Sequence, residues 1–126
     1  MVPKQIYFFA ALLWAGVIAF FCLVQLNNVP LGNVSNLDKL VHVFFHLVLT
    51  MLCFLFFQKH TNDINSLKPI IISFLFSVFF GIGIEIAQEL LTATRHADVF
   101  DVLANLSGAI LGVAFILLFD LKTKVR

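Results

Sequence analysis

Four apolar blocks, each long enough to cross a lipid bilayer, constrain this chain more than any other feature of its sequence. The blocks cover residues 6–26, 40–57, 70–91 and 99–119. A helix needs about 20 residues to cross about 30 Å of hydrocarbon. Because backbone polar groups in lipid must be paired within the protein, each block is predicted to be a transmembrane helix. Strands are not indicated, since apolar runs such as residues 54–57 lack the period-two alternation of a membrane barrel.

The composition excludes most other classes of protein. Of 126 residues, 61% are hydrophobic and 12% are charged, and this charged fraction is roughly half that of an average soluble domain. A chain this short has too little interior to hide so much apolar surface from water. The net charge of +1 provides no field that would attract nucleic acid. The predicted fold is all-α, a polytopic four-helix bundle that forms a single membrane domain over residues 1–126.

The topology follows from the number of blocks and from the positive charges. The first block is expected to be a retained helix, because its apolar stretch exceeds the core of about 7–15 residues that is usual in signal peptides. Four helices place both termini on one face, and Lys and Arg residues near helix ends favour the cytoplasm. The face with the termini carries six of them, namely Lys4, Lys59, Lys68, Lys122, Lys124 and Arg126, against Lys39 and Arg95 on the other. The sequence therefore predicts cytoplasmic termini.

Small side chains inside the blocks indicate how the helices pack. Gly108 and Gly112 are spaced four residues apart, which predicts close packing of the last helix inside the bundle. Cys22 and Cys53 lie in apolar blocks and are expected to be reduced packing residues rather than a disulfide or a metal pair.

Polar residues gather at the predicted outer ends of the last three helices. At helical spacing they form three stripes: Asp38, His42 and His46; Glu85, Gln88 and Glu89; and Asp98, Asp101 and Asn105. A rise of about 1.5 Å per residue places them at similar depth. A charged carboxylate in hydrocarbon costs at least about 2.5 kcal/mol. The stripes are therefore expected to turn inward, towards each other and towards Lys39 and Arg95, and to form a polar pocket that opens outward.

Most of these residues also have a purely structural interpretation. Asp38 and Asp98 each precede an apolar block and are placed to cap a helix. Lys39 is placed to extend its ammonium to the interface, and Asn105 to bridge two helices. Glu85 is the hardest to explain in this way, because it is charged and lies deep within its block.

Three motifs resemble the VanZ-like family of membrane proteins. Residues 38–42 are similar to the "DKxxH" opening of that family's second helix, and residues 85–88 to its "ExxQ". Residues 95–108 are similar to its "RxxDxxDxxxNxxG" signature, and the likeness extends over about residues 38–115. His46 departs from the aromatic residue expected there. The resemblance implies a multi-pass protein of the bacterial cell membrane, in a family associated with resistance to the lipoglycopeptide teicoplanin.

The favoured function is the binding of an amphipathic envelope ligand, such as a membrane lipid, a lipid-linked cell-wall precursor or a lipoglycopeptide. Cationic groups would hold a phosphate or carboxylate, and acidic and amide groups would take amino or hydroxyl groups. The candidate ligand-binding residues are Asp38, Lys39, Gln88, Arg95, Asp98 and Asn105.

Two other functions remain open. An intramembrane hydrolase or transferase would use His42 as acid or base, with Glu85 and Asp101 as further catalytic candidates. A structural accessory protein would use the same polar groups to hold the bundle together. No cofactor is predicted. No metal is predicted either, because the Glu-x-x-His pairs of carboxylate-bridged bundles are absent. The sequence leaves the oligomeric state open.

Overall fold

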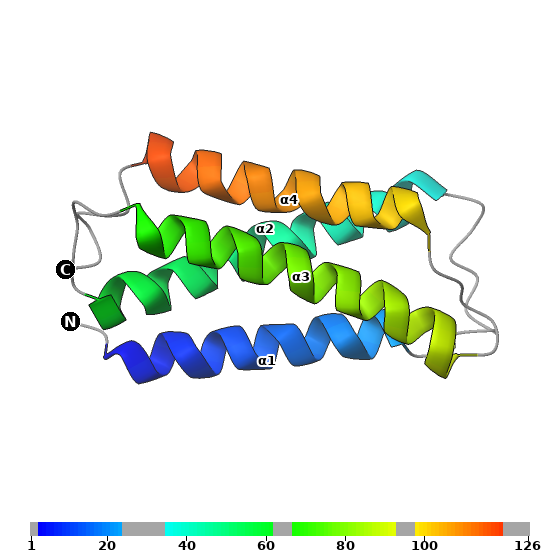
Figure 1. Cartoon of the computed structure of the whole chain (residues 1–126), viewed down its shortest axis with the longest axis horizontal. Coiled ribbons are helices and arrows are strands. Elements are labelled where there is room, and N and C mark those ends of the chain that lie inside the picture. Colours follow the sequence, from blue (N-terminus) through cyan, green and yellow to red (C-terminus); the bar gives the residue numbers. More distant parts are fainter. Residues whose placement is uncertain (1–2, 24–34, 62–66, 93–97, 120–126) are drawn as a thin grey trace.

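The structure, a computed structural model, confirms a bundle of four helices that are each long and apolar enough to span a membrane. It describes residues 3–23, 35–61, 67–92 and 98–119, with side chains from Lys39 onward in the second range. The helices, drawn in Figure 1, are α1 (Lys4–Leu23), α2 (Ser35–Thr61), α3 (Lys68–Leu91) and α4 (Val99–Leu118). Pro69 lies in the first turn of α3, where its missing N–H has no helical partner to lose.

The four helices lie side by side along one axis (Figure 1). The first turn of α1 and the last turn of α4 lie at the same end of the bundle. α2 packs against each of the other three helices, and its contact with α4 is the most extensive. α1 packs on α2 and α3. The end at which α2 and α4 begin is called the Lys39 end below, because it carries the charged residues of the site.

α2 is longer at both ends than its apolar block. It begins at Ser35 and ends at Thr61, whereas the hydropathy pattern predicts residues 40–57. Charged and polar residues at the membrane interface continue a helix as well as apolar ones do, so hydropathy marks the depth of hydrocarbon rather than the end of the helix. The prediction that Asp38 caps this helix is therefore wrong, because Asp38 lies inside α2 rather than before its first turn.

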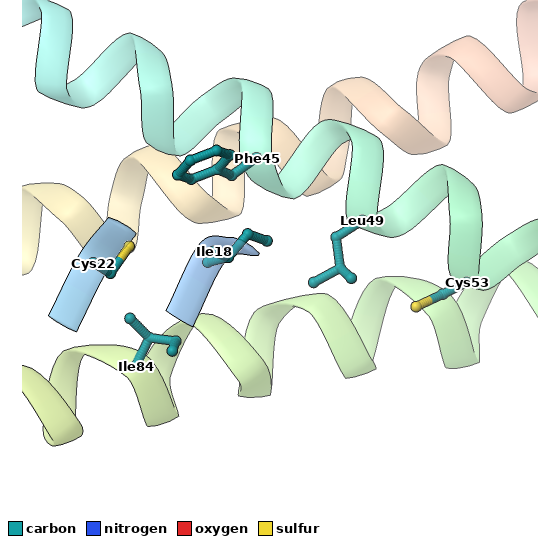
Figure 2. Packing of buried hydrophobic residues seen from close by; sticks show 6 residues of the cluster. All are labelled: Ile18, Cys22, Phe45, Leu49, Cys53 and Ile84. Atoms are coloured by element: carbon teal, nitrogen blue, oxygen red, sulfur yellow. The ribbon is translucent and has the colours of Figure 1, made fainter. Parts of the chain in front are cut away.

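Apolar packing joins α1 to α2 and α3. Figure 2 shows the main cluster, which consists of Ile18, Cys22, Phe45, Leu49, Cys53 and Ile84. Both cysteines are buried in this cluster and form no disulfide, so their predicted role as packing residues is confirmed. A second cluster joins α2, α3 and α4 through Phe54, Ile70 and Ile116.

Glycines allow α4 to approach the backbone of α2. A Cβ atom at Gly108 would overlap the carbonyl oxygen of Val43. At Gly112 it would lie 3.1 Å from the carbonyl oxygen of Leu47. The predicted role of this glycine pair in close helix packing is confirmed, and the contact brings the polar side chains of α4 towards those of α2.

Gly108→Ala is expected to destabilise the bundle, because the new methyl group forces the two backbones apart. Overpacking of this kind costs on the order of 1–3 kcal/mol. Thermal unfolding in detergent measures the loss. Gly83→Ala is the matched control, since a Cβ there would meet nothing within 4 Å. An unfolding temperature unchanged in Gly108→Ala would contradict the close contact.

Candidate functional site

Lys39 joins the beginning of α2 to the beginning of α4. Its ammonium donates to Asp98 Oδ2 at 2.8 Å and also to Asp101 Oδ1. Its side chain is 30% exposed, whereas that of Asp101 is 7% exposed. The ion pairs therefore extend from the surface of the bundle to its interior.

Asp98 caps α4, as predicted. Its side chain accepts a hydrogen bond from the N–H of Phe100 at 2.9 Å. This satisfies one of the backbone donors that a helix start leaves unpaired. The hydrogen bond from Lys39, followed by that from the Phe100 N–H, lowers the pKa of the Asp98 carboxyl below its ordinary value.

Glu85 joins α3 to α4. Its side chain is buried, and Oε2 accepts from the backbone N–H of Asp98 at 3.2 Å. The other carboxylate oxygen, Oε1, is buried without a hydrogen-bond partner among the residues that the structure describes. Buried polar atoms are paired in the great majority of cases, so this oxygen requires an explanation.

His42 joins α2 to α4 at a deeper level. Its Nδ1 lies 2.9 Å from Asn105 Oδ1, so the ring N–H donates to the amide oxygen in this arrangement. Its Nε2 lies 3.7 Å from Asp101 Oδ2, which is longer than a hydrogen bond. Both His42 and Asn105 are 2% exposed. The ring is thus held in one orientation with Nε2 directed at the acidic side chains.

These residues form one group, called the polar cluster below: Lys39, His42, Glu85, Asp98, Asp101 and Asn105. One donor atom each from His42, Glu85 and Asp101 lies within 4.8 Å of the other two. The structure therefore brings together side chains from all three of the stripes seen in the sequence. The cluster can hold a proton between acidic and basic groups, bind a cation, or present the Lys39 ammonium to an anion.

Two stripe residues are hydrogen-bonded outside the polar cluster. Gln88 is buried, but its amide Nε2 donates to the carbonyl oxygen of Cys22 at 2.7 Å and so ties α3 to α1. His46 is hydrogen-bonded through Nδ1 to Ser77 Oγ at 3.0 Å. Glu89 is exposed. Binding of a ligand by Gln88 stays a prediction.

The side chain of Asp38 and the whole of Arg95 lie outside the described residues. Asp38 belongs to the first turns of α2, and Arg95 to the segment between α3 and α4. Their binding roles stay predictions.

Two buried polar side chains of α3 were not predicted from the sequence. Ser73 and Ser77 are fully buried, and Gly81 makes room for the side chains of Asn105 and His46. Together with Glu85, these residues recur every four positions. That spacing marks one face of a helix and could have identified the polar face of α3.

Comparison with known proteins identifies the family. The VanZ/LLP1 family model matches residues 7–120, a range that extends from α1 to the end of α4. The chain belongs to the VanZ/LLP1 family. No curated protein and no solved structure matches it. The match confirms the resemblance drawn from the three motifs, and the four apolar helices make this family member a multi-pass membrane protein.

Asp98→Asn is expected to change the pH dependence of stability of this VanZ/LLP1 protein. Because the folded-state pKa of Asp98 is lowered, its charge stabilises the fold above the unfolded-state pKa of about 3.9 and ceases to do so as the pH falls through the folded-state value. The variant should therefore unfold at a lower temperature than the wild type near pH 7, and the difference should shrink below about pH 4. Asparagine caps helices as well as aspartate does, so the cap is retained. A difference that is independent of pH would contradict the ion pair.

Proposed function

We propose that this protein binds an amphipathic ligand of the bacterial envelope, such as a lipid-linked cell-wall precursor or a lipoglycopeptide, through the polar cluster. The proposal rests on one observation: charged and hydrogen-bonding side chains from three helices meet at the Lys39 end, where the Lys39 side chain is partly exposed. The association of the VanZ-like family with resistance to teicoplanin, a lipoglycopeptide, agrees with a ligand of this class.

The energetic cost of the cluster supports a functional role. Carboxylates within a membrane span are expensive and are usually found where a protein binds or moves something. Glu85 and Asp101 are 3% and 5% exposed within spans that are otherwise largely apolar. A bundle of this size has cheaper ways to join its helices, as the bond from Trp14 Nε1 to the Phe45 carbonyl oxygen illustrates.

The surroundings of the cluster suit a ligand with both a polar and an apolar part. Exposed apolar side chains flank it on α2 and α4: Leu40, Phe44, Val99, Phe100 and Leu103. An acyl chain would lie along this surface in the lipid. The polar head would contact Lys39 through a phosphate or carboxylate, with amino or hydroxyl groups directed at the acidic side chains. Arg95, in the segment between α3 and α4, would add a second cation.

The direction of the cluster is part of the proposal. The excess of Lys and Arg at the opposite end of the bundle favours cytoplasmic termini in the cell membrane. The Lys39 end would then face outward, on the side where cell-wall precursors are used and where glycopeptides arrive.

Arg95→Ala and Lys39→Ala are expected to weaken binding of an acylated glycopeptide by about tenfold or more, because each removes a charge-assisted contact. Native mass spectrometry of the detergent-extracted protein, with teicoplanin as the probe, measures the bound fraction together with any lipid that co-purifies. Lys68→Ala is the matched control, since Lys68 begins α3 at the opposite end. Unfolding temperatures are compared to show that each variant folds.

A second comparison tests the amphipathic character of the ligand. Removal of the acyl chain from the glycopeptide should reduce binding to the wild type, because the chain contributes burial in lipid. Equal binding by wild type, Arg95→Ala and Lys39→Ala would contradict the proposal, as would the absence of any bound amphiphile.

A further inference from the structure

Three donor atoms of the polar cluster face one another from three separate helices. His42 on α2, Glu85 on α3 and Asp101 on α4 each offer one atom within 4.8 Å of the other two, and all three side chains are buried. We infer that these residues hold a divalent transition-metal cation at the Lys39 end of the bundle. The inference rests on these residues alone and does not require the proposed amphipathic ligand.

The unpaired oxygen of Glu85 is the observation that points to a cation. Glu85 is 3% exposed, and its Oε1 has no hydrogen-bond partner among the described residues. An acceptor left unpaired in the interior loses its hydration without compensation, and the loss is larger if the acceptor is charged. A cation shared with His42 and Asp101 would satisfy this oxygen where no hydrogen-bond donor of the described chain reaches it.

In each of the three side chains, the second polar atom is hydrogen-bonded within the protein, as is usual for metal ligands. The other ring nitrogen of His42 is bonded to Asn105 Oδ1, and the other oxygen of Glu85 accepts from the Asp98 N–H. Asp101 Oδ1 accepts from Lys39, so Oδ2 is the oxygen directed towards His42. In metal sites, the hydrogen-bond partners of the ligands fix the tautomer of a histidine and the direction of each ligand atom.

The distances agree with a small ion. Two donors bound at about 2.1 Å to a tetrahedral ion lie about 3.4 Å apart. His42 Nε2 and Asp101 Oδ2 are 3.7 Å apart. This separation is too long for a hydrogen bond, and a small side-chain rotation would bring both atoms onto one ion. A donor atom of Glu85 lies within 4.8 Å of the other two, so its carboxylate would need a larger rotation to reach the same ion.

The charge of the described cluster also favours a divalent ion. The cluster contains three carboxyl groups, those of Glu85, Asp98 and Asp101, and one ammonium, that of Lys39. With all three carboxyl groups ionised and His42 neutral, its formal charge is −2. Such an excess is costly at the depth of a membrane span. A divalent cation balances it.

The donor set indicates the kind of ion. One imidazole and two carboxylates, with no thiolate, suit Zn²⁺ and its first-row neighbours better than Ca²⁺ or Mg²⁺, which prefer all-oxygen sites. Three protein ligands leave a fourth position of a tetrahedral ion open to water or to a ligand from outside. The sequence predicted no metal because it lacks the Glu-x-x-His pairs of carboxylate-bridged bundles, whereas these three ligands come from three separate helices.

Metal loading of the whole protein tests the inference. The protein is purified in detergent with a tag that contains no histidine, stripped with a chelator and titrated with Zn²⁺. About one Zn²⁺ per chain is expected by elemental analysis, together with a rise in the unfolding temperature. Glu85→Gln and Asp101→Asn should each weaken Zn²⁺ binding by at least about tenfold and remove that rise. His46→Gln is the matched control and should leave both measurements unchanged, because His46 is hydrogen-bonded to Ser77 and is not one of the three proposed ligands.

X-ray absorption of the Zn²⁺-loaded wild type keeps the test decisive if a variant fails to fold. A first shell of oxygen and nitrogen with a single imidazole is expected. The inference would be overturned if the wild type failed to bind Zn²⁺ or if Glu85→Gln bound it as tightly as the wild type. It would also be overturned by loss of binding in a folded His46→Gln protein, or by a coordination shell that contains several imidazoles or sulfur.

Discussion

A carboxylate inside hydrocarbon must find partners within the protein, and this requirement organises the Lys39 end of the bundle. Glu85 meets it by accepting the Asp98 N–H, which places α3 against the start of α4. Asp101 meets it through Lys39, which places α2 against the same turn of α4. The two bonds set the positions of three helices relative to one another at one level. Ligand contact and metal binding, as proposed, both depend on that arrangement.

Packing elsewhere in the bundle makes this arrangement possible. Gly108 lets α4 approach the backbone of α2, and Gly81 on α3 leaves space for the side chain of Asn105. α1 takes no part in the cluster among the described residues and is attached mainly by apolar contacts. Gln88 adds one buried hydrogen bond from α3 to α1. The site is thus built by α2, α3 and α4, while α1 packs against apolar side chains of α2 and α3.

The sequence predicts the fold and the meeting of the polar stripes for physical reasons. Apolar length requires helices, and the cost of Glu85 in lipid requires that its helix turn inward. Individual bonds depend on the rotation and tilt of each helix, which periodicity does not determine. Gln88 shares a stripe with Glu85 but is bonded to α1 instead. Ser77 was missed because a serine carries no charge to mark it, and the position of Asp38 inside α2 escaped notice because hydropathy does not mark where a helix begins.

The central claim is that charged side chains from separate helices meet inside the membrane span. Solid-state NMR in lipid bilayers tests it most directly, by measuring dipolar coupling between ¹⁵N of the Lys ammonium groups and ¹³C of the Asp carboxyl groups. The account predicts a strong coupling at the contact of Lys39 with Asp98 and Asp101, and its disappearance in Lys39→Gln. A wild-type signal no stronger than that of the Lys39→Gln protein would contradict it.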